Sequence, residues 1–199
     1  MEFFQTSGRN LIAAEKAARV GHHVALSVLG TDQLLDSGYF RAKMAQEELI
    51  RASPIPHTIL RSTQFFEFIG RIAQSSDDGR SVRVSSAVIQ PIVSDEVAAA
   101  LADLATAAPR NDIIEIAGPE QFYLDDIVRR VMRNNQDARE VITDEHARYF
   151  GAELSDDTLT PDEEEAIIAV TTFDDWLKRS NATRPSDRSA ASASPPAAR

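Results

Sequence analysis

Apolar positions along the chain switch between a helical period and nearly continuous runs. Residues 5–20 follow the helical period, whereas His23 to Leu29 are apolar on both faces, as in a buried parallel strand. A second helix is expected over 38–52 and ends before Pro54, because proline disfavours a helical residue in front of it. Further expected elements are strands over His57–Thr63, Ser81–Ser85, Val88–Val93 and Asp112–Ala117, helices over Gln64–Ala73, Val97–Ala107, Leu124–Met132 and 162–179, and a turn at Asp77-Asp78-Gly79.

The order of these elements indicates how the sheet is built. Helices and strands alternate, which predicts an α/β fold with a parallel sheet and, further along the chain, a small α+β substrate-binding region. About three strands are clear, against about six in a complete doubly wound nucleotide-binding fold, so an incomplete sheet is expected. Residues 1–179 would form this domain. Residues 180–199 are rich in Ser, Ala, Pro and Arg and are predicted to be a disordered C-terminal tail.

Composition excludes several kinds of partner. The formal net charge of −10 argues against nucleic-acid binding, which requires cations that displace counterions from phosphates. No apolar run is long enough to span a bilayer, and Met1 to Gln5 do not resemble the start of a signal peptide. The chain has no cysteine, which excludes disulfides and thiolate chemistry. We therefore expect a cytoplasmic protein with no nucleic-acid or membrane partner.

Acidic residues are concentrated in one segment. Residues 137–175 contain 13 Asp or Glu against two Arg, a net charge of −11, so the rest of the chain sums to +1. A solvated outer face explains such a run, and a surface that repels anionic partners is the alternative. The part from 137 to 165 is expected to belong to the substrate-binding region.

The glycines do not form a phosphate-binding loop. A dinucleotide-binding fold carries G-x-G-x-x-G in its first strand-to-helix turn. No two of the eight glycines are close enough together for that motif. If the sheet ends at the strand that contains Val24, its edge is apolar and unpaired, and exposed backbone groups can pair with another chain. A homodimer through this edge is therefore one expectation.

Candidate chemistry is concentrated in three residues. The strand-like run ends near Ser27, and Tyr39 and Lys43 follow at the start of the next helix. Tyr-x-x-x-Lys places the phenol and the ammonium on one helical face, where the positive charge would lower the phenol pKa from its ordinary ~10 and suit it to proton transfer. The Ser27 hydroxyl would donate to a carbonyl oxygen while Tyr39 protonates it. The spacing equally permits a structural role, with Tyr39 packed at the helix start and Lys43 in solvent.

Other candidate residues give weaker signals. His22 and His23 stand at a strand entrance, and His57 and His146 are isolated, so the spacing supports no metal site. The phenylalanines within 65–68 either line a substrate pocket or belong to the core. A small-molecule substrate is the partner that these residue types favour.

Several segments agree, in order, with one known family. They are Asn10–Ala18, His23–Gly30, Gly38–Lys43, Thr58–Glu67, Gln90–Ala98 and Ile116–Glu120. Together they extend over about residues 3–178 and resemble the short-chain dehydrogenase/reductase superfamily, in particular its atypical NmrA-like NAD(P)-binding proteins. The resemblance implies that the expected sheet is the C-terminal part of a Rossmann-like fold.

The resemblance also implies a role for each candidate residue. Ser27 would orient a substrate carbonyl, Tyr39 would be the general acid, and Lys43 would hold the nicotinamide ribose of NADP or NAD. The strand that ends near Ser62 would border the nicotinamide. The residues after it that would contact the cofactor or the substrate are Thr63, Gln64 and Phe65.

Two features depart from the family pattern. Many relatives have proline where Ser62 stands, and the family's glycine loop has no counterpart in this sequence. We therefore expect an NAD(P)-dependent oxidoreductase that reduces a small carbonyl or quinone substrate if its cofactor site is complete. The alternatives are a non-catalytic dinucleotide-sensing or protein-binding module and a truncated, inactive fragment. Tyr39 favours the enzyme, whereas the missing loop favours the alternatives.

Overall fold

The central sheet is parallel throughout. The computed structural model describes residues 2–75, 79–162 and 164–183. Neighbouring strands of the main sheet all run parallel, in the order β1 (His23–Val28), β2 (His57–Ser62), β5 (Asp112–Ala117) and β8 (Ile167–Ile168). The predicted α/β fold with a parallel sheet is confirmed.

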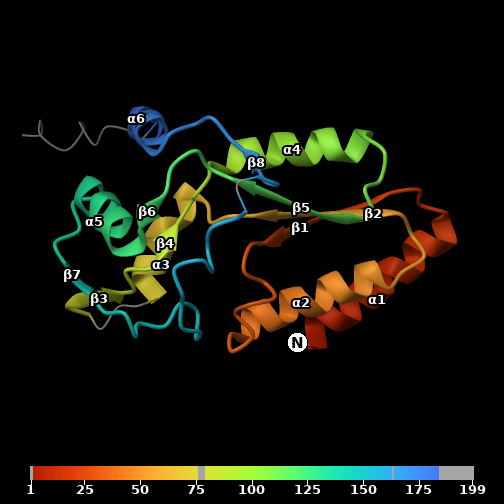
Figure 1. The fold of residues 1–199 in the computed structure, drawn as a ribbon, viewed down its shortest axis with the longest axis horizontal. Helices are drawn as coiled ribbons and strands as arrows, with labels where there is room; N and C mark the ends of the chain where they lie inside the picture. Colours follow the sequence, from red (N-terminus) through yellow and green to blue (C-terminus); the bar gives the residue numbers. More distant parts are fainter. Residues whose placement is uncertain (1, 76–78, 163, 184–199) are drawn as a thin grey trace, which may run out of the picture.

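Helices cover both faces of this sheet, which explains its apolar strands. α1 (Glu2–Ala18) and α2 (Gly38–Arg51) lie on one face, and α4 (Ser94–Thr106) lies on the other (Figure 1). All six residues of β2 are consequently buried. β1 lies at the edge of the sheet, where Leu26 keeps 37% of its surface exposed. Within the described residues β1 pairs with β2 alone, so its other edge is unpaired.

The loop after β1 fixes the start of α2. Gly30 adopts a φ of +79°, and an added Cβ would lie 2.9 Å from the Thr158 carbonyl oxygen, so this position requires glycine. Ser37 is the N-cap residue of α2, although its hydroxyl makes no capping hydrogen bond. The guanidinium of Arg41 instead donates to the Leu35 carbonyl at 2.7 Å and ties the loop to the helix.

A second region of mixed structure adjoins the sheet, as the predicted α+β region requires. Its strands form two pairs: β3 (Ser81–Val84) runs parallel to β7 (Glu140–Thr143), and β4 (Val88–Ile89) runs antiparallel to β6 (Phe122–Tyr123). Its helical elements are η1 (Phe66–Phe68), α3 (Ile69–Ser75), α5 (Leu124–Asn134) and α6 (Phe173–Thr183).

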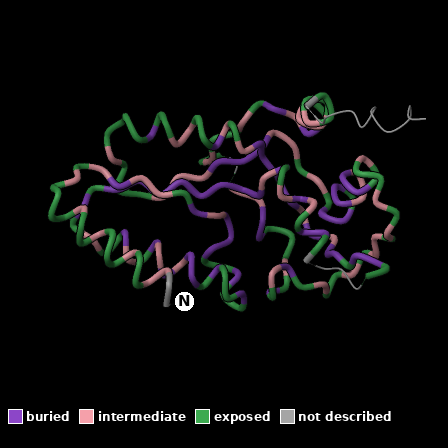
Figure 2. The backbone as a smooth tube through the Cα atoms, turned by 180° about the vertical axis from the view of Figure 1, so that it is seen from behind, coloured by how far each residue is buried: buried purple, intermediate pink, exposed green. Residues whose placement is uncertain are grey.

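Two hydrophobic clusters stabilise the fold. The larger cluster joins α3, α5 and β3 around the fully buried Phe173, whose ring centroid lies 5.5 Å from that of Phe66 and 5.7 Å from that of Phe122. The smaller cluster includes Leu60 and Ile116 of the sheet with residues of α4. Buried residues accordingly follow the central strands and continue into the second region (Figure 2).

Some elements differ from the sequence predictions. The helix expected over 162–179 is wrong, because Ile167–Ile168 form β8 and α6 begins only at Phe173. Pairing with β5 decides this segment, since a β-branched pair beside a sheet edge gains more from the sheet than from a helix. The helix expected over Gln64–Ala73 is interrupted at its start, because Phe65 is extended and forms a bridge with Ile92. Besides β8, the pattern does not predict two further short strands, β6 and β7.

The C-terminal boundary also differs. α6 continues to Thr183, so Ser180–Thr183 are helical although a disordered tail is predicted from residue 180. The rest of that tail, 184–199, and most of the expected turn at 77–79 lie outside the described residues. Among the residues that are described, no helix has the length and apolar character needed to cross a bilayer.

Candidate active site

A pocket of about 480 Å³ opens at the carboxyl ends of β1 and β2. This end of the strands is where ligands bind in open parallel α/β sheets. Every residue that the sequence singles out as a site residue lines this one pocket, although they come from three separate stretches of chain. These residues are Ser27, Tyr39, Lys43, Thr63, Gln64 and Phe65.

Ser27 is 4% exposed and lies one residue before the end of β1. Its hydroxyl donates a 2.5 Å hydrogen bond to the carboxylate of Glu47 on α2. A serine hydroxyl has one proton, so in this arrangement Ser27 offers lone pairs to the pocket rather than a donor. The donation from Ser27 to a substrate carbonyl that the sequence predicts is therefore not prepared in this structure.

Lys43 is 9% exposed, so the alternative in which its side chain lies in solvent is wrong. Its Nζ donates to the Leu26 carbonyl at 2.9 Å and to the side-chain oxygen of Gln46 at 2.7 Å. Burial lowers the pKa of the Lys43 ammonium, and the negative charge of Glu47 partly offsets this effect.

Tyr39 lies in the first turn of α2 and is half exposed. Its ring meets that of Phe40 edge-on at 5.3 Å between centroids. Burial raises the pKa of the Tyr39 phenol, which is opposite to the lowering expected from Lys43. Tyr39 is therefore protonated at neutral pH and can act as a proton donor.

The turn after β2 contains buried polar groups without partners. Thr63 is 1% exposed and Gln64 is 5% exposed. The Thr63 hydroxyl and both polar side-chain atoms of Gln64 have no hydrogen-bond partner; Gln64 lies beside the Tyr149 phenol but forms no hydrogen bond of normal geometry with it. Because buried polar groups are nearly always paired, these atoms are available to a polar group of a ligand in the pocket.

The outer wall of the pocket is aromatic. Phe68 stacks on Phe150 at 6.0 Å between ring centroids, and Phe150 meets Tyr149 edge-on at 4.7 Å. Burial raises the pKa of the Tyr149 phenol, and the neighbouring Gln64 side chain opposes this to a smaller extent. The hydrophobic pattern does not single out Tyr149 and Phe150, which stand in the acidic segment. An aromatic pair followed by Gly151 in an otherwise polar stretch is the signal that could have found them.

The phenylalanines within 65–68 divide between the two roles weighed from the sequence. Phe65 and Phe68 line the pocket. Phe66 is 1% exposed and packs against Trp176 at 5.4 Å in the larger hydrophobic cluster. Among the described residues that line the pocket, Lys43 is the only charged one, so the lining is mainly apolar and aromatic.

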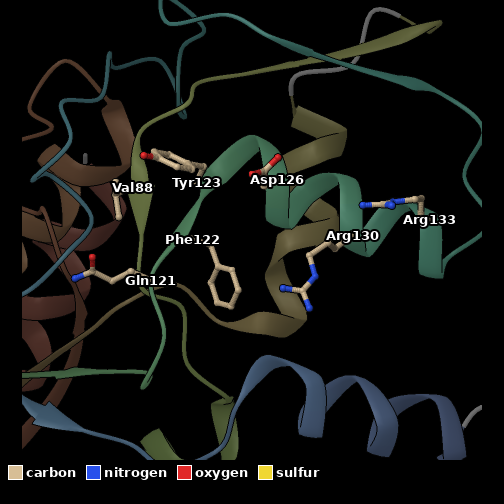
Figure 3. A pocket seen from close by; sticks show the side chains of 7 residues that line it. All are labelled: Val88, Gln121, Phe122, Tyr123, Asp126, Arg130 and Arg133. Atoms are coloured by element: carbon tan, nitrogen blue, oxygen red, sulfur yellow. The ribbon is translucent and has the colours of Figure 1, made fainter.

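A second hollow of about 620 Å³ lies on the outside of β6 and α5 and contains none of the predicted site residues (Figure 3). Arg130 and Arg133 are the cations that line it. The guanidinium of Arg130 lies 4.7 Å from the centroid of the Phe173 ring and donates to Asp174 at 2.6 Å. These contacts tie α5 to α6, so the arrangement of Arg130 is explained by packing.

The histidines near β1 have structural contacts. His22 Nε2 lies 2.9 Å from the Thr58 hydroxyl, and His23 Nδ1 lies 2.8 Å from a carboxylate oxygen of Glu15. In the ranges that the structure describes, no group of three or more His, Asp or Glu side chains could hold a metal ion.

Known proteins are similar to this chain in structure rather than in sequence. No family model matches the sequence, and no curated protein is significantly similar to it. Among solved structures, an NADPH-dependent quinone oxidoreductase of Escherichia coli is 19% identical with a TM-score of 0.63, and the match covers 87% of this chain and 72% of that one. A second structure of that enzyme is its complex with NADPH.

Two further structures show the same fold. WbmG of Bordetella bronchiseptica, crystallised with NAD, is 14% identical with a TM-score of 0.57, and the match covers 88% of this chain and 62% of that one. TunA, an NAD-dependent NDP-hexosamine 5,6-dehydratase of tunicamycin biosynthesis, is 12% identical with a TM-score of 0.61, over 92% and 70% of the two chains. At these identities the matches establish a common fold, so the role of each residue rests on its own geometry.

Proposed function

We propose that the protein is an NAD(P)-dependent oxidoreductase of the short-chain dehydrogenase/reductase type, similar to the NmrA-like proteins. The observation that carries this proposal is the convergence of Ser27, Tyr39 and Lys43 with Thr63 and Gln64 on one pocket. The nicotinamide dinucleotides bound in two of the similar structures support the class of cofactor.

The nicotinamide end of such a cofactor fits the pocket. The Thr63 hydroxyl and the Gln64 carboxamide, both buried and without partners, would hold its polar groups, and Lys43 would hold the ribose. A bound NAD(P)H would supply the hydride. For the diphosphate end, the described ranges contain no comparable binding loop, because none of their turns between a strand and a helix has a G-x-G-x-x-G sequence. Binding of the whole dinucleotide is therefore the first property to measure.

The lining favours a planar, apolar substrate. Aromatic side chains form the outer wall, and a phosphate-bearing substrate would instead require arginine or lysine side chains directed at it. A quinone or an aromatic ketone is planar enough to pack against the aromatic wall and carries no phosphate. Tyr39, which is protonated at neutral pH, would donate the proton that the carbonyl oxygen takes up.

A second function, dinucleotide sensing or protein binding without turnover, is favoured by one observation. The only proton of the Ser27 hydroxyl is committed to Glu47, which leaves Tyr39 as the single hydroxyl donor of the expected pair. A site with one of its two donors occupied could bind a cofactor and turn over slowly or not at all.

Titration with NADPH and NADH, followed by reduced-nicotinamide fluorescence, tests these functions. Micromolar binding together with reduction of a benzoquinone or an aromatic ketone would support the enzyme. Micromolar binding without turnover would support the sensing module. No binding up to millimolar concentrations would contradict both.

A further inference from the structure

A buried ion pair lies beneath the pocket. Glu47 of α2 is 1% exposed and Arg61 of β2 is 7% exposed. Arg61 donates from Nε to one carboxylate oxygen of Glu47 at 3.1 Å and from Nη2 to the other at 2.7 Å. Desolvating two charges is costly unless their hydrogen bonds are satisfied, and this two-point contact fixes the orientation of the carboxylate.

The ion pair connects solvent to the candidate site. At its outer end, Arg61 donates from Nη1 to Asp32 at 3.1 Å, and the Asp32 side chain is half exposed. At its inner end, the Glu47 oxygen that accepts from Arg61 Nε also accepts the hydroxyl proton of Ser27. Ser27 and Arg61 are direct neighbours in the register of β1 and β2, so the sheet itself places them together.

Two side chains of α2 hold successive residues at the end of β1. Lys43 and Glu47 are four residues apart and therefore lie on the same face of the helix. Lys43 binds the carbonyl of Leu26, and Glu47 binds the hydroxyl of Ser27. The helix that carries Tyr39 is thus attached to the strand that carries Ser27 by contacts made inside the site.

We propose that Glu47, anchored by Arg61, is a positioning residue of this site: it fixes the Ser27 hydroxyl as an acceptor and supplies a negative charge one helical turn from Lys43. This proposal rests on the proposed function for its catalytic meaning, but the contacts themselves do not depend on turnover. The two hydroxyls then have different roles: Tyr39 donates a hydrogen bond to the substrate, and the oxygen of Ser27 accepts one from a ligand group.

The charges around Lys43 make the proposal measurable. Burial lowers the pKa of Lys43, and Glu47 opposes that lowering. Arg61, the cation nearest in the network, is bonded to Glu47, and Tyr39 one turn earlier on α2 is uncharged at neutral pH. Removing the charge of Glu47 while keeping its shape should therefore lower the pKa of Lys43 further.

The first experiment follows the lysine side chains by NMR. The chain contains three lysines, so protein labelled with ¹³C at lysine Cε gives few signals, and Lys43→Arg identifies the one of interest. Glu47→Gln should lower the Lys43 pKa by about one unit, the size expected for loss of a nearby opposite charge. Asp32→Asn is the matched control, because it removes the other carboxylate on Arg61 and should leave Lys43 unchanged. An equal shift in the two variants, or none, would overturn the proposal.

A second variant guards against misfolding of Glu47→Gln. The double substitution Glu47→Leu with Arg61→Met removes the whole ion pair, and apolar replacements of similar volume are often tolerated. It should lower the Lys43 pKa in the same direction but by less than Glu47→Gln does, because the positive charge of Arg61 is removed together with the negative charge of Glu47. A Lys43 pKa equal to that of the wild type in this folded variant would also contradict the proposal.

Kinetics separate failure of this proposal from failure of the proposed function. If the wild type reduces a quinone, Glu47→Gln should lower kcat about tenfold or more and leave KM within about threefold. The loss of activity that accompanies rising pH should also begin at a lower pH than in the wild type, because the Lys43 ammonium gives up its proton earlier. Unchanged kcat and an unchanged pH profile would overturn the role of Glu47 alone. A wild type without cofactor binding or turnover would contradict the proposed function, while the lysine titration would still decide the role of Glu47.

Discussion

The ammonium of Lys43 donates a 2.9 Å hydrogen bond to the backbone carbonyl of Leu26, the residue before Ser27. Lys43 therefore stabilises the end of β1 as well as the site that we propose for the ribose. We predict that Lys43→Ala weakens NADPH binding about tenfold and lowers turnover, since it removes a charged hydrogen-bond donor. Lys16→Ala, on the exposed side of α1, is the control, and fluorescence titration is the measurement. An unchanged NADPH dissociation constant in Lys43→Ala would contradict this role.

Tyr39→Phe should separate binding from chemistry. The ring and its edge-on contact with Phe40 are kept, and only the phenolic hydroxyl is removed. We expect the NADPH dissociation constant to change less than about twofold, and quinone reduction to fall roughly 10²- to 10⁴-fold, because general acid catalysis contributes that much. Full activity of the variant in steady-state assays would refute the assignment of Tyr39 as proton donor.

Gly118 follows β5 at a close backbone contact. A Cβ at this position would lie 1.9 Å from the carbonyl oxygen of Pro91, so Gly118→Ala must displace one of the two segments. We predict that it lowers the free energy of unfolding by about 3 kcal/mol. Gly70→Ala is the matched control, because its Cβ would meet nothing within 4 Å in α3 and should raise stability by about 0.5–1 kcal/mol. Urea denaturation measures the unfolding midpoints of the two variants. Similar midpoints would show that the prediction is wrong.

Asp125 gives the second region a dependence on pH. Burial raises the pKa of its carboxyl, but hydrogen bonds from Thr143 at 2.5 Å and Arg129 at 2.7 Å outweigh this and lower the pKa below its ordinary value. The stabilisation is therefore complete above the ordinary pKa of about 4 and is lost as pH falls through the lowered value. Asp125→Asn should reduce the free energy of unfolding by about 1–3 kcal/mol at pH 7, with the difference from wild type vanishing in acid. A difference that stays constant from pH 7 to pH 2 would exclude this linkage.

The unpaired edge of β1 remains the basis for a proposed homodimer. Within the described residues no strand pairs with this edge and Leu26 is exposed, as at the edges through which sheets extend between chains, although side chains already bind two of its carbonyls, those of Leu26 and Val28. We expect sedimentation equilibrium to show a dimer. Hydrogen exchange of the β1 amides should then be slower in the dimer than in the dilute monomer. A monomeric mass at every concentration would count against pairing at this edge.

The sequence predicts those parts of the fold that local patterns determine. Asp112–Ala117 is a strand with the bounds that its apolar run indicates, and α2 ends at Arg51, before Pro54, as the sequence predicts. Ile167–Ile168 could not be predicted in this way, because their strand exists only through pairing with β5. Acidic residues precede this pair in the sequence and a helix-forming segment follows it, so the pattern suggests one long helix.

The site shows the same division. Ser27, Tyr39 and Lys43 stand at the ends of predictable elements, so their spacing predicts that they meet. Glu47 resembles a solvent-facing charge on an amphipathic helix, and only the packing of α2 on β2 reveals that it is buried against Arg61. Likewise, Tyr149 reaches the pocket through a turn that no periodic pattern specifies.

The pocket takes its lining from both hydrophobic clusters, since Phe65 packs with the smaller one and Phe40 and Tyr149 belong to the larger one. A ligand that fills the pocket would therefore touch both clusters at once. If the clusters are separately cooperative units, each would open with its own free energy when the pocket is empty. With the ligand bound, part of the binding energy would couple the two, so that they unfold together and at a higher denaturant concentration. Occupancy would then be visible as a sharper unfolding transition of the whole molecule, before any catalytic assay is run.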